Sequence, residues 1–172
     1  MVILGVDPGY ATVGCGTLKY QNGRFDALDA RAIITPAKTP FEKRLLSIYQ
    51  GIKGLLTEFN PDAIALEELF FSHNQTTGMA VAHARGVILL AAAEHGVEPF
   101  EYGPLQVKQA VTGYGKAEKR QMMEMTKSIL RLAELPKPDD VADALAVAIC
   151  HGNSSGPNAL RAAVEKQRRE KK

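Results

Sequence analysis

The strongest constraint on the fold of this chain is an uninterrupted apolar segment, residues 2–6, that ends at Asp7. Strands buried on both faces have such continuous apolar sequences, whereas strands with one solvated face alternate apolar and polar residues. The Asp7-Pro8-Gly9 sequence that follows is typical of a turn. The sequence therefore predicts a central, buried strand with a carboxylate at its carboxyl end.

Two β-compatible segments, residues 12–20 and 25–34, flank Gln21-Asn22-Gly23, which is a typical hairpin turn. Together with the first strand they predict an antiparallel meander. Apolar residues then recur at helical spacing until Pro61, which predicts a long amphipathic helix. The apolar positions of this helix are Phe41, Leu45, Ile48, Ile52, Leu55, Leu56 and Phe59.

The rest of the chain alternates between strands and helices. Strands are predicted over 63–66 and 97–102, and helices over 75–93, 104–111, 117–132 and 139–151. This order predicts an α/β fold of the ribonuclease H-like arrangement, a mixed sheet of about five strands with helices on both faces. We expect residues 1–152 to form one domain and residues 153–172 to form a basic, disordered tail.

We expect a globular protein of the cytoplasm. No apolar run approaches the roughly 20 residues of a membrane helix, and no signal peptide is recognisable. Cys15 and Cys150 have no metal-type spacing and are expected to be reduced, buried thiols. The net charge of +2 is uneven, because residues 161–172 carry six basic and two acidic residues and the other 160 residues sum to −2. Overall charge therefore does not indicate nucleic-acid binding.

Carboxylates stand where two apolar strands end. Asp7 follows the first strand, and Glu67 and Glu68 follow Ile64-Ala65-Leu66. Adjacent residues of a strand point to opposite sides, so one of the two glutamates faces the layer next to Asp7. The sequence alone does not decide which. For Asp7 taken alone, a purely structural role in the turn is the favoured interpretation, because Asp-Pro-Gly is also a typical turn sequence.

Three further acids open the last helix. Asp139 follows Pro138 and is predicted as an N-cap, and acids in a first turn also complement the helix dipole. Asp140 and Asp143 lie three residues apart, on the face that continues through Ala144 and Val147. Carboxylates on a buried face are unfavourable unless something compensates their charge, and a bound cation is one such compensation.

Acids at two strand ends and at i, i+3 of a helix suggest a shared site. Oxygen-only ligands suit Mg²⁺, and two such ions roughly 4 Å apart can activate water and stabilise the leaving oxygen at a phosphodiester. The alternative is that all of these acids are structural.

Six sequence blocks occur in order across residues 1–152. These blocks are Gly5-Val6-Asp7-Pro8-Gly9-Tyr10, Ala65-Leu66-Glu67-Glu68-Leu69-Phe70, Ala84-Arg85-Gly86-Val87, Gln106-Val107-Lys108-Gln109, Ala117-Glu118-Lys119 and Asp140-Val141-Ala142-Asp143-Ala144-Leu145-Ala146. In order and spacing they resemble the RuvC family of Holliday junction resolvases.

The resemblance implies a structure-specific endonuclease of recombination and repair, with Asp7, Glu67, Asp140 and Asp143 as catalytic metal ligands. It implies two Mg²⁺ per subunit, for which Mn²⁺ can substitute. It further implies a homodimer that makes paired nicks across four-way junction DNA and leaves ligatable ends. A branch-migration helicase complex of the RuvA and RuvB type is the implied partner.

Cationic residues gather between 108 and 131, where the net charge is +4. On a helix that starts near 116, one face would hold Lys116, Arg120, Lys127 and Arg131 without intervening acids. Such a face is either merely solvated or contacts phosphates. Lys108 and Lys119 match lysines that the family uses at the DNA backbone, and proximity adds Lys116 and Arg120 as candidates.

Two aromatic residues, Phe70 and Phe71, precede a polar segment. Either they pack in the core, or one of them stacks on DNA. The resemblance implies that Phe70 stacks on an unpaired base, which is typically worth about 1–3 kcal/mol. The four histidines (His73, His83, His95 and His151) are interpreted as structural or incidental.

The helix predicted over 75–93 is apolar around most of its circumference, with Gly78, Ala82 and Gly86 four residues apart. This row is either buried within one subunit or lies at a dimer interface, and the resemblance implies the latter. An isologous dimer matches the near two-fold symmetry of a junction.

Two other functions fit parts of the pattern. Ribonuclease H-fold ATPases also begin with a strand and an Asp-x-Gly turn, but they carry a second phosphate-binding unit that no residue after 70 repeats. A non-catalytic junction-binding module would not need all four acids.

Overall fold

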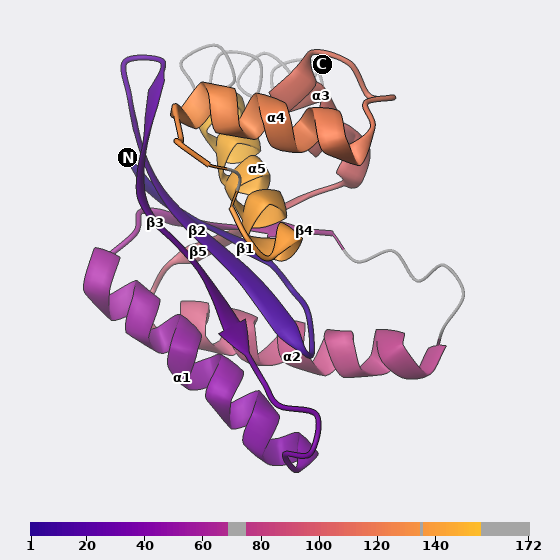
Figure 1. Cartoon of the computed structure of the whole chain (residues 1–172). Helices are drawn as coiled ribbons and strands as arrows, with labels where there is room; N and C mark the ends of the chain where they lie inside the picture. The colour runs from indigo at the N-terminus through magenta and orange to yellow at the C-terminus, as the bar shows by residue number, and fades with distance from the viewer. Residues whose placement is uncertain (69–74, 135, 156–172) are drawn as a thin grey trace, which may run out of the picture.

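The computed structural model describes residues 1–68, 75–134 and 136–155. Its five-stranded mixed sheet has the order β3-β2-β1-β4-β5 (Figure 1). The meander β1 (Val2–Asp7), β2 (Thr12–Gln21) and β3 (Arg24–Ile34) is antiparallel, whereas β4 (Ala63–Glu67) and β5 (Glu98–Tyr102) run parallel to β1. As predicted, β1 is the central strand, with Ile3, Leu4 and Val6 fully buried.

Helices cover both faces of the sheet, as predicted. α1 (Phe41–Phe59) and α2 (Gln75–Glu94) lie on one face, and α3 (Pro104–Thr112), α4 (Lys119–Leu130) and α5 (Asp139–Ser154) lie on the other (Figure 1). Each face has its own hydrophobic core, one built around Ile48, Ile52 and Ile88 and the other around Leu145 and Ile149. None of the described helices combines the length and apolarity needed to cross a membrane.

α5 packs unusually close to the sheet because glycines face it. A Cβ added to Gly14 would lie 1.9 Å from the carbonyl oxygen of Asp140, and one added to Gly5 would lie 2.0 Å from that of Ala144. Real Cβ atoms do not approach a backbone oxygen this closely, so the helix can rest here only on bare Cα atoms. These contacts place the first turn of α5 at the carboxyl end of β1.

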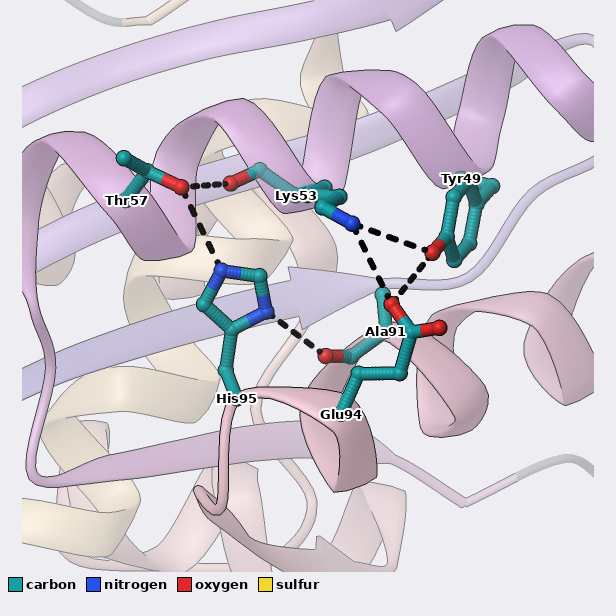
Figure 2. Close-up of polar contacts among 6 residues, drawn as sticks. All are labelled: Tyr49, Lys53, Thr57, Ala91, Glu94 and His95. Atoms are coloured by element: carbon teal, nitrogen blue, oxygen red, sulfur yellow. Dashed lines mark hydrogen bonds and ion pairs between the residues drawn. The ribbon is translucent and has the colours of Figure 1, made fainter.

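A polar seam joins α1 to α2 on the opposite face. Figure 2 shows the hydroxyl of Tyr49 and the ammonium of Lys53 directed at Glu94, and the hydroxyl of Thr57 at His95. The Lys53 Nζ to Glu94 Oε2 distance is 3.4 Å, and both side chains are about half exposed. Exposed pairs of this kind typically contribute at most about 1 kcal/mol, so the seam orients the two helices more than it stabilises them.

The structure corrects two details of the sequence prediction. α4 begins at Lys119 rather than near 116 and ends at Leu130, because Arg131 adopts a left-handed conformation with φ of 53°. Lys116 and Arg131 therefore lie outside the helix, and the predicted four-residue cationic face keeps only Arg120 and Lys127. The N-cap of α5 is Pro138, so the prediction of Asp139 as the cap was wrong by one residue.

The two cysteines and the end of the last helix were also predicted from the sequence. Cys15 and Cys150 are buried, free thiols, as predicted. α5 continues to Ser154, two residues past the predicted domain boundary, and residues 156–172 of the expected tail lie outside the described part of the chain.

Candidate active site

Asp7 and Glu67 lie side by side at the carboxyl ends of two parallel strands. The register of β1 and β4 pairs Val6 with Leu66, and both of these side chains point into the core under α1 and α2. Because side chains alternate along a strand, the next residue on each strand turns to the opposite face, the one covered by α5.

The structure separates the two adjacent glutamates. Glu67 is half-buried, whereas Glu68 is exposed. The backbone N–H of Glu68 donates to the carbonyl of Tyr102 at 2.9 Å, which extends the β4–β5 pairing by one residue. Glu67 is therefore the glutamate that shares a face with Asp7.

α5 brings the other two acids to the same place. Gly14, on which the Asp140 carbonyl rests, pairs with Asp7 across the β1–β2 ladder. Asp140 and Asp143 are half-buried, whereas residues 144–152 are all buried, so α5 has no separate solvated face over that stretch and the predicted contrast between a buried and a solvated stripe is not seen. Close packing of backbone on backbone thus sets the position of these acids relative to Asp7.

Burial and the charges of neighbouring acids raise the pKa of two of the four carboxylates. Burial raises the pKa of Asp7 to about 7, with further contributions from the charges of Glu67, Asp143 and Asp140, in that order. The pKa of Glu67 is also raised, first by burial and then by the charge of Asp143. A site whose acids oppose each other's ionisation at neutral pH is stabilised by any cation that enters it.

One cation of the chain already lies among these acids. The Lys119 ammonium is 3.1 Å from Asp143 Oδ2 and 3.5 Å from Asp139 Oδ2. Partial burial of Lys119 acts to lower its pKa, but the hydrogen bond and charge of Asp143 and the charge of Asp139 outweigh it and raise the pKa. The Lys119 side chain is still 56% exposed, so it remains within reach of a ligand in solution.

Acidic and basic side chains line one cavity of about 210 Å³ between the sheet edge, α3, α4 and α5. Its lining residues are Glu67, Pro104, Val107, Lys108, Lys119, Met122 and Asp143. Lys116 and Arg120 are exposed and do not line it, and Phe70 lies outside the described residues. Lys108 and Lys119 thus line one cavity with Glu67 and Asp143. Lys116 and Arg120 lie on the outer surface.

The donor set fits a hard divalent cation by chemistry and by charge. All four candidate ligands are carboxylates, which Mg²⁺ prefers, and their mutual repulsion is the unfavourable term that such an ion would remove. Among the described residues, however, no three His, Cys, Asp or Glu side chains are gathered into a ready coordination shell. The Lys119 ammonium lies against Asp143 instead.

Known proteins resemble this chain over most of its length. The family model described as crossover junction endodeoxyribonuclease RuvC matches residues 3–151. The chain belongs to the RuvC family. A RuvC of Ruminiclostridium cellulolyticum is 56% identical over 160 residues, which cover 93% of this chain and 96% of that protein. A RuvC of Clostridioides difficile is 52% identical over 155 residues, covering 90% and 92%.

Solved RuvC structures share the fold over nearly the same span. A structure of Thermus thermophilus RuvC matches with a TM-score of 0.84 and 36% identity, covering 90% of this chain and 95% of that one. T. thermophilus RuvC in complex with a Holliday junction substrate matches with a TM-score of 0.83 and 34% identity at the same coverage. RuvC membership and the ribonuclease H-like fold predicted from the sequence are therefore confirmed.

Sequence reasoning missed Arg44, which lies next to the turn that follows Asp7. The signal was present, because Arg44 stands four residues before Ile48 and eight before Ile52, on the apolar stripe of α1. A charged residue on such a stripe is expected to be buried, and Arg44 is only 6% exposed.

The described histidines form hydrogen bonds within the protein. His151 is buried and shares a hydrogen bond with the Tyr102 hydroxyl at 2.8 Å, and burial lowers its pKa. His83 and His95 contact backbone carbonyls one helical turn before them. His73 lies outside the described residues.

Proposed function

We propose that this chain is a metal-dependent endonuclease that resolves four-way DNA junctions by paired, symmetric phosphodiester hydrolysis. The observation that carries the proposal is the meeting of two strand ends and the first turn of α5, where burial and the charges of neighbouring acids raise the pKa of Asp7 and Glu67. The 56% identity to a crossover junction endodeoxyribonuclease over nearly the whole chain supports the same activity.

In this proposal Asp7, Glu67, Asp140 and Asp143 hold two Mg²⁺ per subunit, and Mn²⁺ can take their place. Bound there, the ions would supply activation of the attacking water and stabilisation of the leaving oxygen. The acids themselves act as fixed, ionised ligands. Asp7 must be deprotonated for this role, and its raised pKa means that protons and metal compete for it near neutral pH.

Basic residues around the cavity would bind the DNA backbone. Lys108 and Lys119 line the same cavity as Glu67 and Asp143, which supports a role for them in binding the phosphates nearest the scissile bond. Lys116 and Arg120 are exposed beyond it and would contact flanking phosphates. These contacts position the duplex without reading its sequence. Phe70 is proposed to stack on an unpaired base at the crossover.

α2 is the proposed dimer interface. The row Gly78, Ala82 and Gly86 continues to Leu90, which is 54% exposed, and Met79 beside it is 63% exposed. Ala84, Ile88 and Ala91 instead fill the core under the sheet, so the row faces away from its own subunit. An apolar helix face with small residues permits the close approach of a second copy, and a two-fold dimer would present two cavities to a symmetric junction.

The proposed setting is homologous recombination and DNA repair in the cytoplasm. The proposed partner is a branch-migration helicase complex of the RuvA and RuvB type, which would deliver the junction. These expectations extend from the family membership of the chain.

A cleavage assay on a four-way junction, with Mg²⁺ present or chelated, tests the proposal. We expect two symmetrically placed nicks with ligatable ends in Mg²⁺, none after chelation, and no dependence on ATP. Binding without nicks in Mg²⁺ would instead indicate a non-catalytic junction-binding module. ATP hydrolysis without nicks would indicate an ATPase.

A further inference from the structure

Arg44 is a buried cation without an acidic partner in the described part of the chain. Its guanidinium group lies under the turn after β1, and no described carboxylate forms an ion pair with it. Burying a charge is unfavourable unless its hydrogen bonds are satisfied. The hydrogen bonds and the ring contact of Arg44 are therefore what compensates the burial of its charge.

The contacts of Arg44 join two segments that are distant in sequence. Its Nε donates to the hydroxyl oxygen of Thr35 at 2.9 Å, and one terminal nitrogen donates to the Thr35 carbonyl at 3.1 Å and the Tyr10 carbonyl at 3.4 Å. The guanidinium carbon also lies 3.6 Å from the centroid of the Tyr10 ring, which is a close cation–π contact.

Tyr10 is held by further contacts around the same group. The Thr35 hydroxyl donates to the Tyr10 carbonyl at 2.7 Å, and the Phe41 ring centroid lies 5.3 Å from that of Tyr10. Thr35 therefore accepts from Arg44 and donates to Tyr10. The guanidinium, the hydroxyl and the two rings form one compact cluster that fixes both the backbone and the side chain of Tyr10.

Tyr10 is connected to Asp7 through a tight turn. A Cβ at Gly9 would lie 1.8 Å from the Thr12 carbonyl oxygen, so the backbone of the turn is closely packed. Only Pro8 and Gly9 separate the Asp7 backbone from the fixed Tyr10. Asp7 is the last residue of β1, and its backbone orientation thus depends on the position at which Tyr10 is held.

We propose that Arg44 is a positioning residue that fixes the Asp7 carboxylate by clamping the turn through Tyr10 and Thr35. The inference rests on the proposed function, because it gives Asp7 a role as a metal ligand. Groups that orient metal ligands typically change metal affinity or activity by about 10–100-fold when they are removed. Arg44 acts through Tyr10 and is not itself placed against the metal or the DNA.

The test compares full-length Arg44→Met, Arg44→Lys and Thr35→Val with the wild type. Lys53→Met is the control, since Lys53 is a cation on the same helix whose contacts run to Tyr49 and Glu94. It lies nine residues from Arg44, which is roughly 14 Å along the helix. Mn²⁺ affinity is measured from the electron paramagnetic resonance signal of the free ion, without DNA. Junction cleavage gives kcat and KM, and thermal melting reports folding.

For Arg44→Met we expect a 10–100-fold loss of Mn²⁺ affinity and a similar fall in kcat, with the KM for the junction within about twofold of the wild type. Arg44→Lys and Thr35→Val should lose less, because each keeps part of the clamp, and Lys53→Met should match the wild type. If Arg44→Met does not fold, the other two variants carry the test. Folded variants with wild-type Mn²⁺ affinity and kcat would overturn the inference.

Failure of the proposed function is a separate result. A wild-type protein that binds Mn²⁺ but makes no nicks would refute the nuclease proposal. In that case the Mn²⁺ titration would still decide the role of Arg44.

Discussion

The carbonyl oxygen of Asp140 rests on the bare Cα of Gly14, where an added methyl carbon would lie only 1.9 Å away. Gly14 pairs with Asp7 across the sheet, so this contact sets the distance between the carboxyl end of β1 and the first turn of α5. The candidate site is therefore assembled by backbone packing beneath it, which makes the site sensitive to small changes at a residue that carries no functional group.

Gly14→Ala should displace the start of α5 and disrupt the site. The added methyl group would meet the backbone of Asp140, which cannot rotate away as a side chain can, so α5 must move. Overpacking of this kind typically lowers the free energy of unfolding by about 1–3 kcal/mol. Urea unfolding should show that loss of stability, and junction cleavage should fall by more than the folded fraction explains. Gly54→Ala is the control, because its Cβ would meet open space in the middle of α1. It should raise stability by roughly 0.5–1 kcal/mol and leave cleavage unchanged.

Asp7 should make the metal-free protein less stable as pH rises. Its pKa is 3.8 in a model peptide and about 7 in the fold, so the folded state holds the proton more tightly than the unfolded state. The stability linked to Asp7 is fully present below about pH 4 and is lost as pH rises to 7. In chelator at pH 8, Asp7→Asn should therefore be more stable than the wild type, by an amount on the order of a few kcal/mol.

The stability difference between Asp7→Asn and the wild type should shrink as pH falls towards 4, and it should shrink or reverse at pH 8 when Mg²⁺ is added. Unfolding in denaturant across pH 4–8 measures it. A difference that does not change with pH would refute the assignment of a raised pKa to Asp7.

The two adjacent glutamates provide a matched pair of variants. Glu67→Gln should reduce cleavage by about a hundredfold or more, since removing even an outer-shell partner of a metal ligand typically costs 10–100-fold. Glu68→Gln makes the same substitution at the neighbouring residue, whose side chain is exposed. The cleavage rate of this variant should stay within about threefold of that of the wild type. Steady-state cleavage of both variants measures this contrast, and equal losses would contradict the assignment of Glu67.

Lys116 should contribute to DNA affinity through phosphate contact alone. Lys116→Ala is expected to weaken junction binding to a similar extent for different sequences. It should also make the slope of log affinity against log salt shallower by about one. Titrations at several salt concentrations in chelator, so that no DNA is cut, give this slope. Lys53→Ala on the α1–α2 seam is the control, and an unchanged slope for Lys116→Ala would remove Lys116 from the interface.

Much of the fold follows from the sequence because its signals are local. The uninterrupted apolar run before Asp7 predicted a central strand, and the helical spacing from Phe41 to Phe59 predicted the bounds of α1 as observed. Asp140 and Asp143 were predicted to lie on one side of the last helix, and their spacing of three residues within α5 gives this by helical geometry alone.

Other features depend on contacts between distant segments, which no local pattern contains. The partly buried glutamate could not be chosen until the register of β4 against β1 was known. The start of α4 at Lys119 was missed because helix ends have weak sequence signals. For the same reason Lys116 was wrongly predicted to lie on this helix. The burial of Arg44 could have been predicted from the apolar stripe of α1, but its contact with Tyr10, 34 residues earlier, could not.

The central claim is that Asp7, Glu67, Asp140 and Asp143 hold divalent cations in one site. Anomalous diffraction from crystals of the full chain soaked in Mn²⁺ tests this most directly. We expect anomalous peaks between these four carboxylates, and their loss in Asp7→Asn. Peaks that lie elsewhere, or Mn²⁺ that contacts none of these four residues, would contradict it.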